Sequence, residues 1–251
     1  MHNPFSLEGK RILVTGASSG IGRATAIECA RQGATLVLNG RNEKALLETK
    51  EALEGQDCRE HTLFVADWSD KQVYERIGNE LPALDGVVCN AGISKMLPVQ
   101  FYSEEALEEV FQVNCFAPML LMRHLVRQKK LKKPSSVVFT ASISGYSNVA
   151  PANGIYGASK SALSAYMKYA ALELAGKGIR CNAVHPGRIQ TPLIENRLLT
   201  EEDVKKDIAS YPMGRYGKPE EVAYAIVYLL SDAAAWVTGT DLLIDGGRSL
   251  R

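Results

Sequence analysis

The sequence has no long apolar run, almost no net charge and no secretion-type start, and each absence argues against a class of protein. No apolar run approaches the roughly 20 residues that a membrane-spanning helix needs. The first ten residues, MHNPFSLEGK, show neither the basic start nor the apolar stretch of a secretion signal. The 29 basic and 28 acidic residues give a net charge of +1. We therefore expect neither nucleic acid nor a membrane surface as a partner.

Cysteine and histidine are few and scattered. The five cysteines are odd in number and include no CxxC pair, which favours a reduced, cytoplasmic protein over a disulfide-bonded one. The four histidines make no metal-ligand spacing with one another or with the cysteines. The sequence predicts no metal site.

What the sequence does contain is a regular alternation of strand and helix patterns. Nearly continuous apolar runs predict strands at 11–16, 34–40, 61–67, 84–92, 135–142, 179–187 and 240–247. Such runs are typical of parallel strands covered on both faces. Amphipathic stretches between them, such as 21–33, 42–55 and 218–232, predict helices. We expect one α/β domain over residues 1–251, a doubly wound Rossmann-type fold with about seven parallel strands and helices on both faces.

Three glycines gather where the first predicted strand runs into a helix. Gly16, Gly20 and Gly22 lie in TGASSGIGRA. Glycine permits a tight turn and close approach of a pyrophosphate, and the helix N-terminus offers free N–H donors. The cluster predicts a dinucleotide site, with an ordinary strand–helix turn as the alternative.

The end of the second strand indicates which dinucleotide is bound. An NAD-binding protein needs a carboxylate there for the ribose hydroxyls, whereas NADP needs a cation for its 2′-phosphate. The segment LVLNGRN carries no acid and places Arg41 at the strand end. A guanidinium can bind a phosphate through two hydrogen bonds. We predict NADP(H) rather than NAD(H), the alternative being a solvated loop arginine.

Tyr156 and Lys160 are four residues apart, which places them on one face of a helix. A lysine ammonium held there would favour the phenolate and lower the tyrosine pKa, which would make the tyrosine an acid/base catalyst near neutral pH. A chance pair is the alternative.

Taken together, these motifs resemble the short-chain dehydrogenase/reductase family over essentially the whole chain. The family's glycine turn matches Thr15 to Gly22, its N-A-G motif matches 90–92, and its P-G-x-x-x-T motif matches 186–191. The resemblance implies four catalytic residues: Asn114, Ser142, Tyr156 and Lys160. It also implies a cofactor site made of Gly16, Ser18, Ser19, Gly20, Ile21, Gly22, Arg41, Asp67, Trp68, Asn90, Ala91, Gly92, Tyr156, Lys160, Pro186, Gly187, Ile189 and Thr191.

In the implied mechanism Tyr156 is the general acid/base for a carbonyl–alcohol pair, and Ser142 hydrogen-bonds the same substrate oxygen. Lys160 lowers the Tyr156 pKa and holds the nicotinamide ribose, and Asn114 anchors a water of a proton relay. Ser144 competes with Ser142, but the family pattern of a serine, two further residues and then a glycine is met by Ser142 with Gly145. A substrate lid is expected at about 188–210.

The expected activity is that of an NADP-dependent alcohol dehydrogenase or carbonyl reductase acting on a small molecule. Three alternatives stay open: a 3-oxoacyl-carrier-protein reductase with an acyl-carrier protein as partner, a sugar or polyol dehydrogenase, and an NADP-binding sensor or scaffold without chemistry. The segment ISKM after the N-A-G motif, and Leu172 before Glu173, depart from the acyl-carrier reductases.

The resemblance further implies a homo-oligomer, commonly a tetramer, paired through 103–127, 155–176 and the last strand with its tail. The apolar face of Leu163, Tyr166, Ala170 and Leu174 would suit such an interface and would suit core packing equally well.

Overall fold

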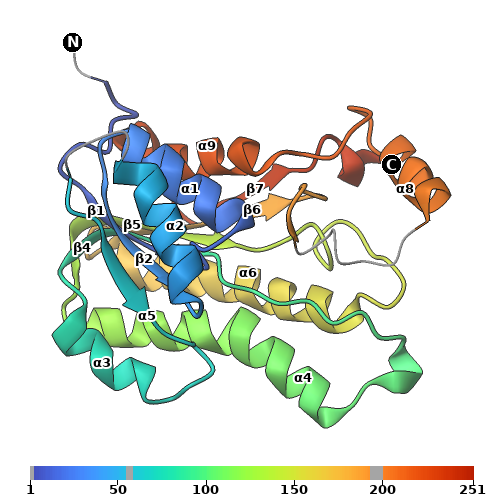
Figure 1. The fold of residues 1–251 in the computed structure, drawn as a ribbon, viewed down its shortest axis with the longest axis horizontal. Coiled ribbons are helices and arrows are strands. Elements are labelled where there is room, and N and C mark those ends of the chain that lie inside the picture. Colours follow the sequence, from blue (N-terminus) through green and yellow to red (C-terminus); the bar gives the residue numbers. More distant parts are fainter. Residues whose placement is uncertain (1–2, 55–58, 193–199) are drawn as a thin grey trace.

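A computed structural model describes residues 3–54, 59–192 and 200–251. Its centre is a parallel sheet of seven strands in the order β3-β2-β1-β4-β5-β6-β7 (Figure 1). The strands are β1 Arg11–Thr15, β2 Thr35–Gly40, β3 Thr62–Val65, β4 Leu84–Cys89, β5 Leu131–Thr140, β6 Ile179–Pro186 and β7 Asp241–Ile244. The predicted fold class is confirmed. β5 begins four residues earlier than the apolar run indicated, because Leu131 pairs with Leu84 before an irregularity in the ladder.

Helices cover both faces of the sheet. The longer ones are α1 Gly20–Arg31, α2 Glu43–Glu54, α3 Val73–Glu80, α4 Glu104–Phe111, α5 Ala117–Arg127, α6 Gly154–Ala175, α8 Glu201–Ala209 and α9 Pro219–Leu230. A π-helical segment, η2 Gln112–Phe116, joins α4 to α5, and short 3₁₀ turns lie at η1 Val99–Phe101, η3 Asp232–Ala234 and η4 Arg248–Leu250. In Figure 1, α1, α2 and α9 lie on one side of the sheet, and α3, α5 and α6 lie on the other.

Each face of the sheet has its own apolar core. The residues between the sheet and α3, α5 and α6 include Ile77, Leu121 and Met167. The second core, against α1, α2 and α9, includes Leu46 and Val222. Because both faces are buried, the strands need apolar side chains at successive positions, which accounts for their continuous apolar runs.

The apolar face on α6 belongs to the core. Leu163, Ala170 and Leu174 are buried against the sheet, and Tyr166 packs edge-on against Phe139 with ring centroids 6.0 Å apart. The large apolar side chains that α6 exposes are instead Tyr169 and Leu172.

The strand order turns back between β1 and β4, the point where open parallel sheets form a crevice at their carboxyl ends. Thr15, the last residue of β1, joins the two strands there. Its Oγ1 donates to the Val88 carbonyl at 3.2 Å and accepts from the N–H groups of Asn90 and Ala91 at 2.9 and 3.0 Å. The fold thus fixes the N-A-G segment beside the glycine turn.

Candidate active site

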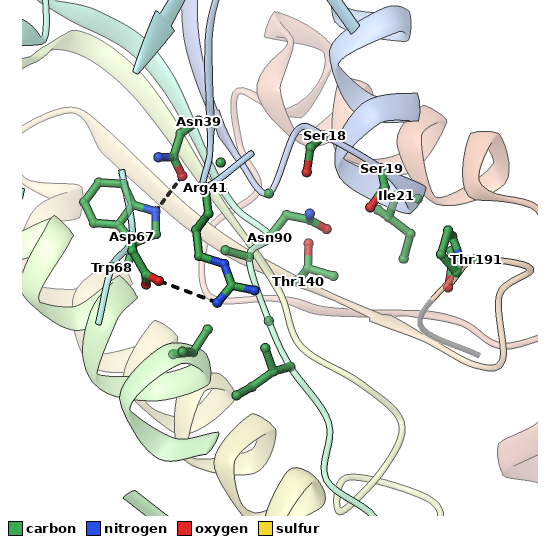
Figure 2. A pocket seen from close by; sticks show the side chains of 18 of the residues that line it. Ser18, Ser19, Ile21, Asn39, Arg41, Asp67, Trp68, Asn90, Thr140 and Thr191 are labelled. Carbon is green, nitrogen blue, oxygen red and sulfur yellow. Dashed lines mark hydrogen bonds and ion pairs between the residues drawn. The ribbon is translucent and has the colours of Figure 1, made fainter. Parts of the chain in front are cut away.

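A pocket of about 430 Å³ lies at the β1–β4 crevice (Figure 2). Most of the residues expected at a cofactor line it: Gly16, Ser18, Ser19, Gly20, Ile21, Arg41, Asp67, Trp68, Asn90, Ala91, Gly92, Tyr156, Lys160 and Thr191. Seven further residues complete the wall: Asn39, Gly40, Ala66, Ile93, Val113, Thr140 and Pro192. Residues from most of the chain therefore converge on one cavity.

The glycine turn has the shape that close approach of a ligand requires. Gly16 and Gly20 have φ of +66° and +52°, in the region that glycine tolerates best. A Cβ on Gly22 would lie 2.1 Å from the carbonyl oxygen of Gly16, so only glycine fits this tight turn. Ser19 at the N-cap of α1 makes no capping hydrogen bond through its side chain within the described residues. The first-turn N–H donors of α1 therefore point toward the pocket with their positive dipole end.

The far wall of the pocket is built from β2 and the segment after β3. The buried Asn39 side chain donates to the carbonyls of Phe64 and Ala66, at 2.9 and 3.3 Å, and accepts from Trp68 Nε1 at 2.6 Å. Figure 2 shows the Asn39–Trp68 pair beside Arg41. Asn39 is a wall residue that the motif comparison did not include. A polar residue inside an apolar strand run was the available signal.

Arg41 reaches from the end of β2 to Asp67, with Nη1 3.5 Å from Oδ2 (Figure 2). Its side chain is 69% exposed, so this ion pair is screened and weak. Partial burial raises the pKa of Asp67, but hydrogen bonds from Ser69 and the Arg41 charge outweigh it and lower the pKa overall. The guanidinium thus lies at the pocket, and breaking its ion pair with Asp67 costs little free energy.

Lys160 lies completely buried beneath the pocket. Its Nζ donates to the Thr140 carbonyl at 2.7 Å and lies 5.9 Å from the centroid of the Tyr156 ring. Burial lowers the pKa of Lys160 to about 8. The helical spacing does place both residues on the wall of one pocket. A cation close to the phenol favours loss of the phenolic proton.

Asn114 lies in the π-helical segment and is fully buried. Its Oδ1 accepts from the Ile93 N–H at 2.8 Å, and its Nδ2 donates to the Ile93 carbonyl at 2.9 Å and to Ser159 Oγ at 3.0 Å. Ser159 in turn donates to the Tyr156 carbonyl at 2.7 Å. Asn114 therefore ties the segment after β4 to the first turn of α6.

The two competing serines have different surroundings. Ser142 Oγ accepts from the Ser144 N–H at 3.0 Å, which leaves its own proton available for donation. Ser144 Oγ accepts from Asn153 Nδ2 at 2.6 Å and would lie 3.4 Å from a Cβ on Gly157. Each hydroxyl therefore accepts one hydrogen bond and keeps its own proton, and the two differ in the donor: a backbone N–H for Ser142 and the Asn153 side chain for Ser144.

Six expected site residues do not line the pocket. Asn114 hydrogen-bonds the lining residue Ile93, Ser142 follows the lining residue Thr140 by two positions, and Gly22 lies in the glycine turn. Pro186 ends β6, and Gly187 approaches Asp245, whose Cα would be 3.0 Å from a Cβ at 187. Ile189 is buried in the core against Gly217, so its side chain points away from the pocket. Of the expected lid, 193–199 lie outside the described residues.

Thr140 Oγ1 is a buried polar atom in the pocket wall, and it has no hydrogen-bond partner in the described part of the chain. A polar ligand in the pocket would supply one. The glycine turn, this hydroxyl and the buried lysine make a site that fits a phosphate-bearing dinucleotide. Within 3–54, 59–192 and 200–251, no group of three or more His, Cys, Asp or Glu could hold a metal ion, and no helix is long and apolar enough to cross a membrane.

Comparison with known proteins gives relatives over nearly the full length of the chain. The family model described as enoyl-(acyl carrier protein) reductase matches residues 16–249. A 3-oxoacyl-[acyl-carrier-protein] reductase of Thermotoga maritima is 37% identical over 246 residues, covering 96% of this chain and 98% of that protein. A glucose 1-dehydrogenase of Gluconobacter oxydans is 36% identical over 246 residues, covering 96% and 92%.

Two solved structures superpose on nearly the whole of this chain. A proposed 2-deoxy-D-gluconate 3-dehydrogenase from Agrobacterium tumefaciens with bound NADP superposes with a TM-score of 0.91 at 31% identity, covering 100% of both chains. The active-site complex of RhlG from Pseudomonas aeruginosa with NADP superposes with a TM-score of 0.90 at 32% identity, covering 99% of this chain and 100% of that one.

Proposed function

Because the chain belongs to the short-chain dehydrogenase/reductase family of oxidoreductases, we propose that it interconverts a carbonyl and a secondary alcohol with NADP(H). The observation that carries this proposal is the approach of the buried Lys160 ammonium to the Tyr156 ring inside the pocket, at 5.9 Å from its centroid. A scaffold or sensor without chemistry would have no need to bury a lysine there.

NADP(H), when bound, supplies or accepts the hydride. We assign its phosphates to the N-terminus of α1 at Ser18 to Ile21, and its 2′-phosphate to Arg41. Gly40 stands at the end of β2, where an NAD-specific protein would carry a carboxylate. The NADP present in two similar structures supports the same choice of cofactor.

In the direction of reduction, Tyr156 donates its proton to the carbonyl oxygen of the substrate. Ser142 Oγ donates a hydrogen bond to the same oxygen, because its acceptor side is already used by the Ser144 N–H. Lys160 stabilises the resulting phenolate. Since the Asn114 amide is engaged by Ile93 and Ser159, we assign the relay water to the backbone carbonyl of Asn114.

The substrate we propose is a carbonyl carried on an apolar chain, such as a 3-oxoacyl thioester. We refer to four exposed apolar side chains, on the segment between β4 and α4 and on the one before α6, as the lip: Met96, Val99, Phe101 and Val149. The Leu97 N–H donates to the Ala152 carbonyl at 2.9 Å, which joins the two segments of this lip. Leu97 and Tyr102 pack against a small cluster of Ala106, Val110 and Ile155, and Ile155 directly precedes the proposed catalytic tyrosine.

A sugar or polyol is the second candidate, because relatives named for both kinds of substrate are about equally similar. An exposed apolar lip gives a polyhydroxylated substrate few hydrogen-bonding partners, which is why we place this candidate second.

We also propose a substrate lid over about 188–210, of which 188–192 and 200–210, with α8, are described. The Asp207 carboxylate on α8 is bound by the Arg188 guanidinium and accepts from the Tyr216 hydroxyl at 2.7 Å. For the homo-oligomer, the exposed Phe116, Tyr169 and Leu172 on η2 and α6 are the residues we expect at the contact.

The test is loss of NADPH absorbance with acetoacetyl thioester and, in separate assays that start from NADP+, gain of NADPH absorbance with glucose and with ribitol, with the Tyr156→Phe protein as control. We expect turnover with the thioester, and loss of turnover with retained NADPH binding in the control. Turnover by the Phe variant would refute the catalytic assignment. Turnover with the sugars alone would select the second candidate.

A further inference from the structure

His185 is a buried histidine next to the proposed catalytic serine, and the mechanism above makes no use of it. It lies in β6 and is completely buried. Its Nδ1 is 2.8 Å from the backbone carbonyl oxygen of Ser142, and its Nε2 is 2.8 Å from Asp241 Oδ1. One imidazole ring therefore connects Ser142 to the first residue of β7.

Both partners of this ring are hydrogen-bond acceptors. A neutral imidazole carries only one N–H, so in either tautomer one ring nitrogen would turn its lone pair toward an oxygen. The imidazolium form carries an N–H at both nitrogens and satisfies both contacts. The geometry is therefore that of a histidine cation paired with a carboxylate.

The surroundings suit a buried cation. Asp241 accepts from Ser164 Oγ at 2.7 Å and is bound by Lys168 Nζ at 2.8 Å, both on α6. Burial raises the pKa of Asp241, but hydrogen bonds from Lys168, Ser164 and His185 outweigh it and lower the pKa, so the carboxylate stays charged. From the loop after β5, the Tyr146 ring packs on the imidazole with centroids 4.2 Å apart, a contact that favours a cation.

The contact to Ser142 falls at a gap in the backbone pairing. The N–H groups of Ala141 and Ile143 donate to Val184 and Pro186 of β6, at 2.9 and 3.2 Å. The Ser142 carbonyl between them is held by the His185 side chain. Fixing that carbonyl fixes the rotation of the Ser142 backbone, and with it the direction of Oγ.

We propose that His185, as an imidazolium paired with Asp241, is a positioning residue that orients Ser142 toward the substrate oxygen. This inference rests on the proposed function. It adds a charged connection that runs from the surface, at Lys168, through Asp241 and His185 to the active-site loop.

Two variants test the contacts of the two ring nitrogens separately. His185→Asn places an amide nitrogen near the position of Nδ1 and keeps a donor for the Ser142 carbonyl. His185→Gln places one near Nε2 and keeps only the contact to Asp241. We expect kcat to fall on the order of tenfold to hundredfold in the Gln variant and clearly less in the Asn variant, with the Kd for NADPH unchanged in both. His124→Gln, on α5, is the matched control and keeps full activity.

The charge of the ring is measured directly, by NMR of the full-length protein with isotopically labelled histidine nitrogens near neutral pH. We expect protons on both nitrogens of His185, assigned by their loss in the variants.

A neutral ring at neutral pH overturns the inference, as do equal losses of kcat in the Asn and Gln variants. If the variants do not fold, the wild-type spectrum near neutral pH still decides whether the ring is an imidazolium. A wild-type protein that reduces no carbonyl refutes the proposed function instead, while the spectrum still decides the charge of His185.

Discussion

A Cβ built on Gly92 would lie 3.2 Å from Lys160 Nζ and 3.2 Å from Asn114 Oδ1. Because Gly92 has no side chain, the N-A-G segment leaves the space that the Lys160 ammonium occupies. Gly92 does not have a positive φ, so close approach, and not backbone conformation, explains why the residue is glycine.

Gly92→Ala should push the Lys160 ammonium away from Tyr156. We expect kcat to fall on the order of tenfold, because small displacements of catalytic groups are costly, while the protein stays folded. The measurement is kcat with the best substrate, beside thermal unfolding. Gly176→Ala is the control, since nothing lies within 4 Å of a Cβ there. Full activity in Gly92→Ala would show that the ammonium has no catalytic role at this position.

Lys160→Met should change how stability depends on pH. Burial lowers the pKa of Lys160 to about 8 in the folded protein, against 10.5 for a lysine in water. Between these values the unfolded chain binds more protons than the folded one, so the wild type gains stability as the pH rises through this window. At about pH 7 the charged, buried lysine carries its full cost, and the methionine variant avoids it.

The Tm of Lys160→Met minus that of the wild type should therefore be larger near pH 7 than near pH 10. Measuring the difference between two proteins removes the general effect of alkali. The kcat of the variant should fall on the order of hundredfold or more. A Tm difference that stays constant over this pH range would mean that Lys160 keeps an ordinary pKa.

The fold and most of the pocket wall could be predicted from the sequence because they follow from short-range signals. Continuous apolar runs indicate covered parallel strands, and the glycines between Thr15 and Gly22 are where a tight turn requires them. The order of the strands then brings the N-A-G segment beside that turn.

Contacts between distant residues gave no such signal. Asn39 and Trp68 are 29 residues apart, and no sequence pattern within either segment predicts their hydrogen bond. The face of α6 was also ambiguous, because this helix carries apolar residues on more than one side. Only the packed structure separates the buried Leu163 and Ala170 from the exposed Tyr169 and Leu172.

Arg41→Ala should weaken the binding of NADPH and leave the binding of NADH nearly unchanged. Loss of the guanidinium that faces the 2′-phosphate should raise the KM for NADPH by about tenfold and leave the KM for NADH nearly unchanged. Lys44→Ala, an exposed cation on α2, is the control for general loss of positive charge. Equal changes for both cofactors would place the phosphate elsewhere.

Gly40→Asp combined with Arg41→Ala should reverse the preference toward NADH. The new carboxylate would stand at the end of β2, where it can accept from the ribose hydroxyls and repel a 2′-phosphate. A Cβ at position 40 would lie 3.3 Å from Leu46 Cδ2 and 3.5 Å from Ser18 Oγ, so a small shift of the leucine accommodates it. The ratio of kcat/KM for the two cofactors is the measurement, and an unchanged ratio would contradict the placement of the ribose.

Ser142→Ala and Ser144→Ala should fail in different ways, because the two hydroxyls have different partners. We assign the substrate contact to Ser142 Oγ, so its loss should lower kcat on the order of hundredfold, and it should also cost about 1–2 kcal/mol of stability because the Ser144 N–H loses its acceptor. Loss of Ser144 Oγ leaves the Asn153 amide without its acceptor at 2.6 Å, which should cost about 1–2 kcal/mol of stability. Its effect on kcat should be the smaller of the two. Measuring kcat and the free energy of unfolding for both variants separates the roles, and a larger loss of kcat in Ser144→Ala would move the catalytic assignment to that serine.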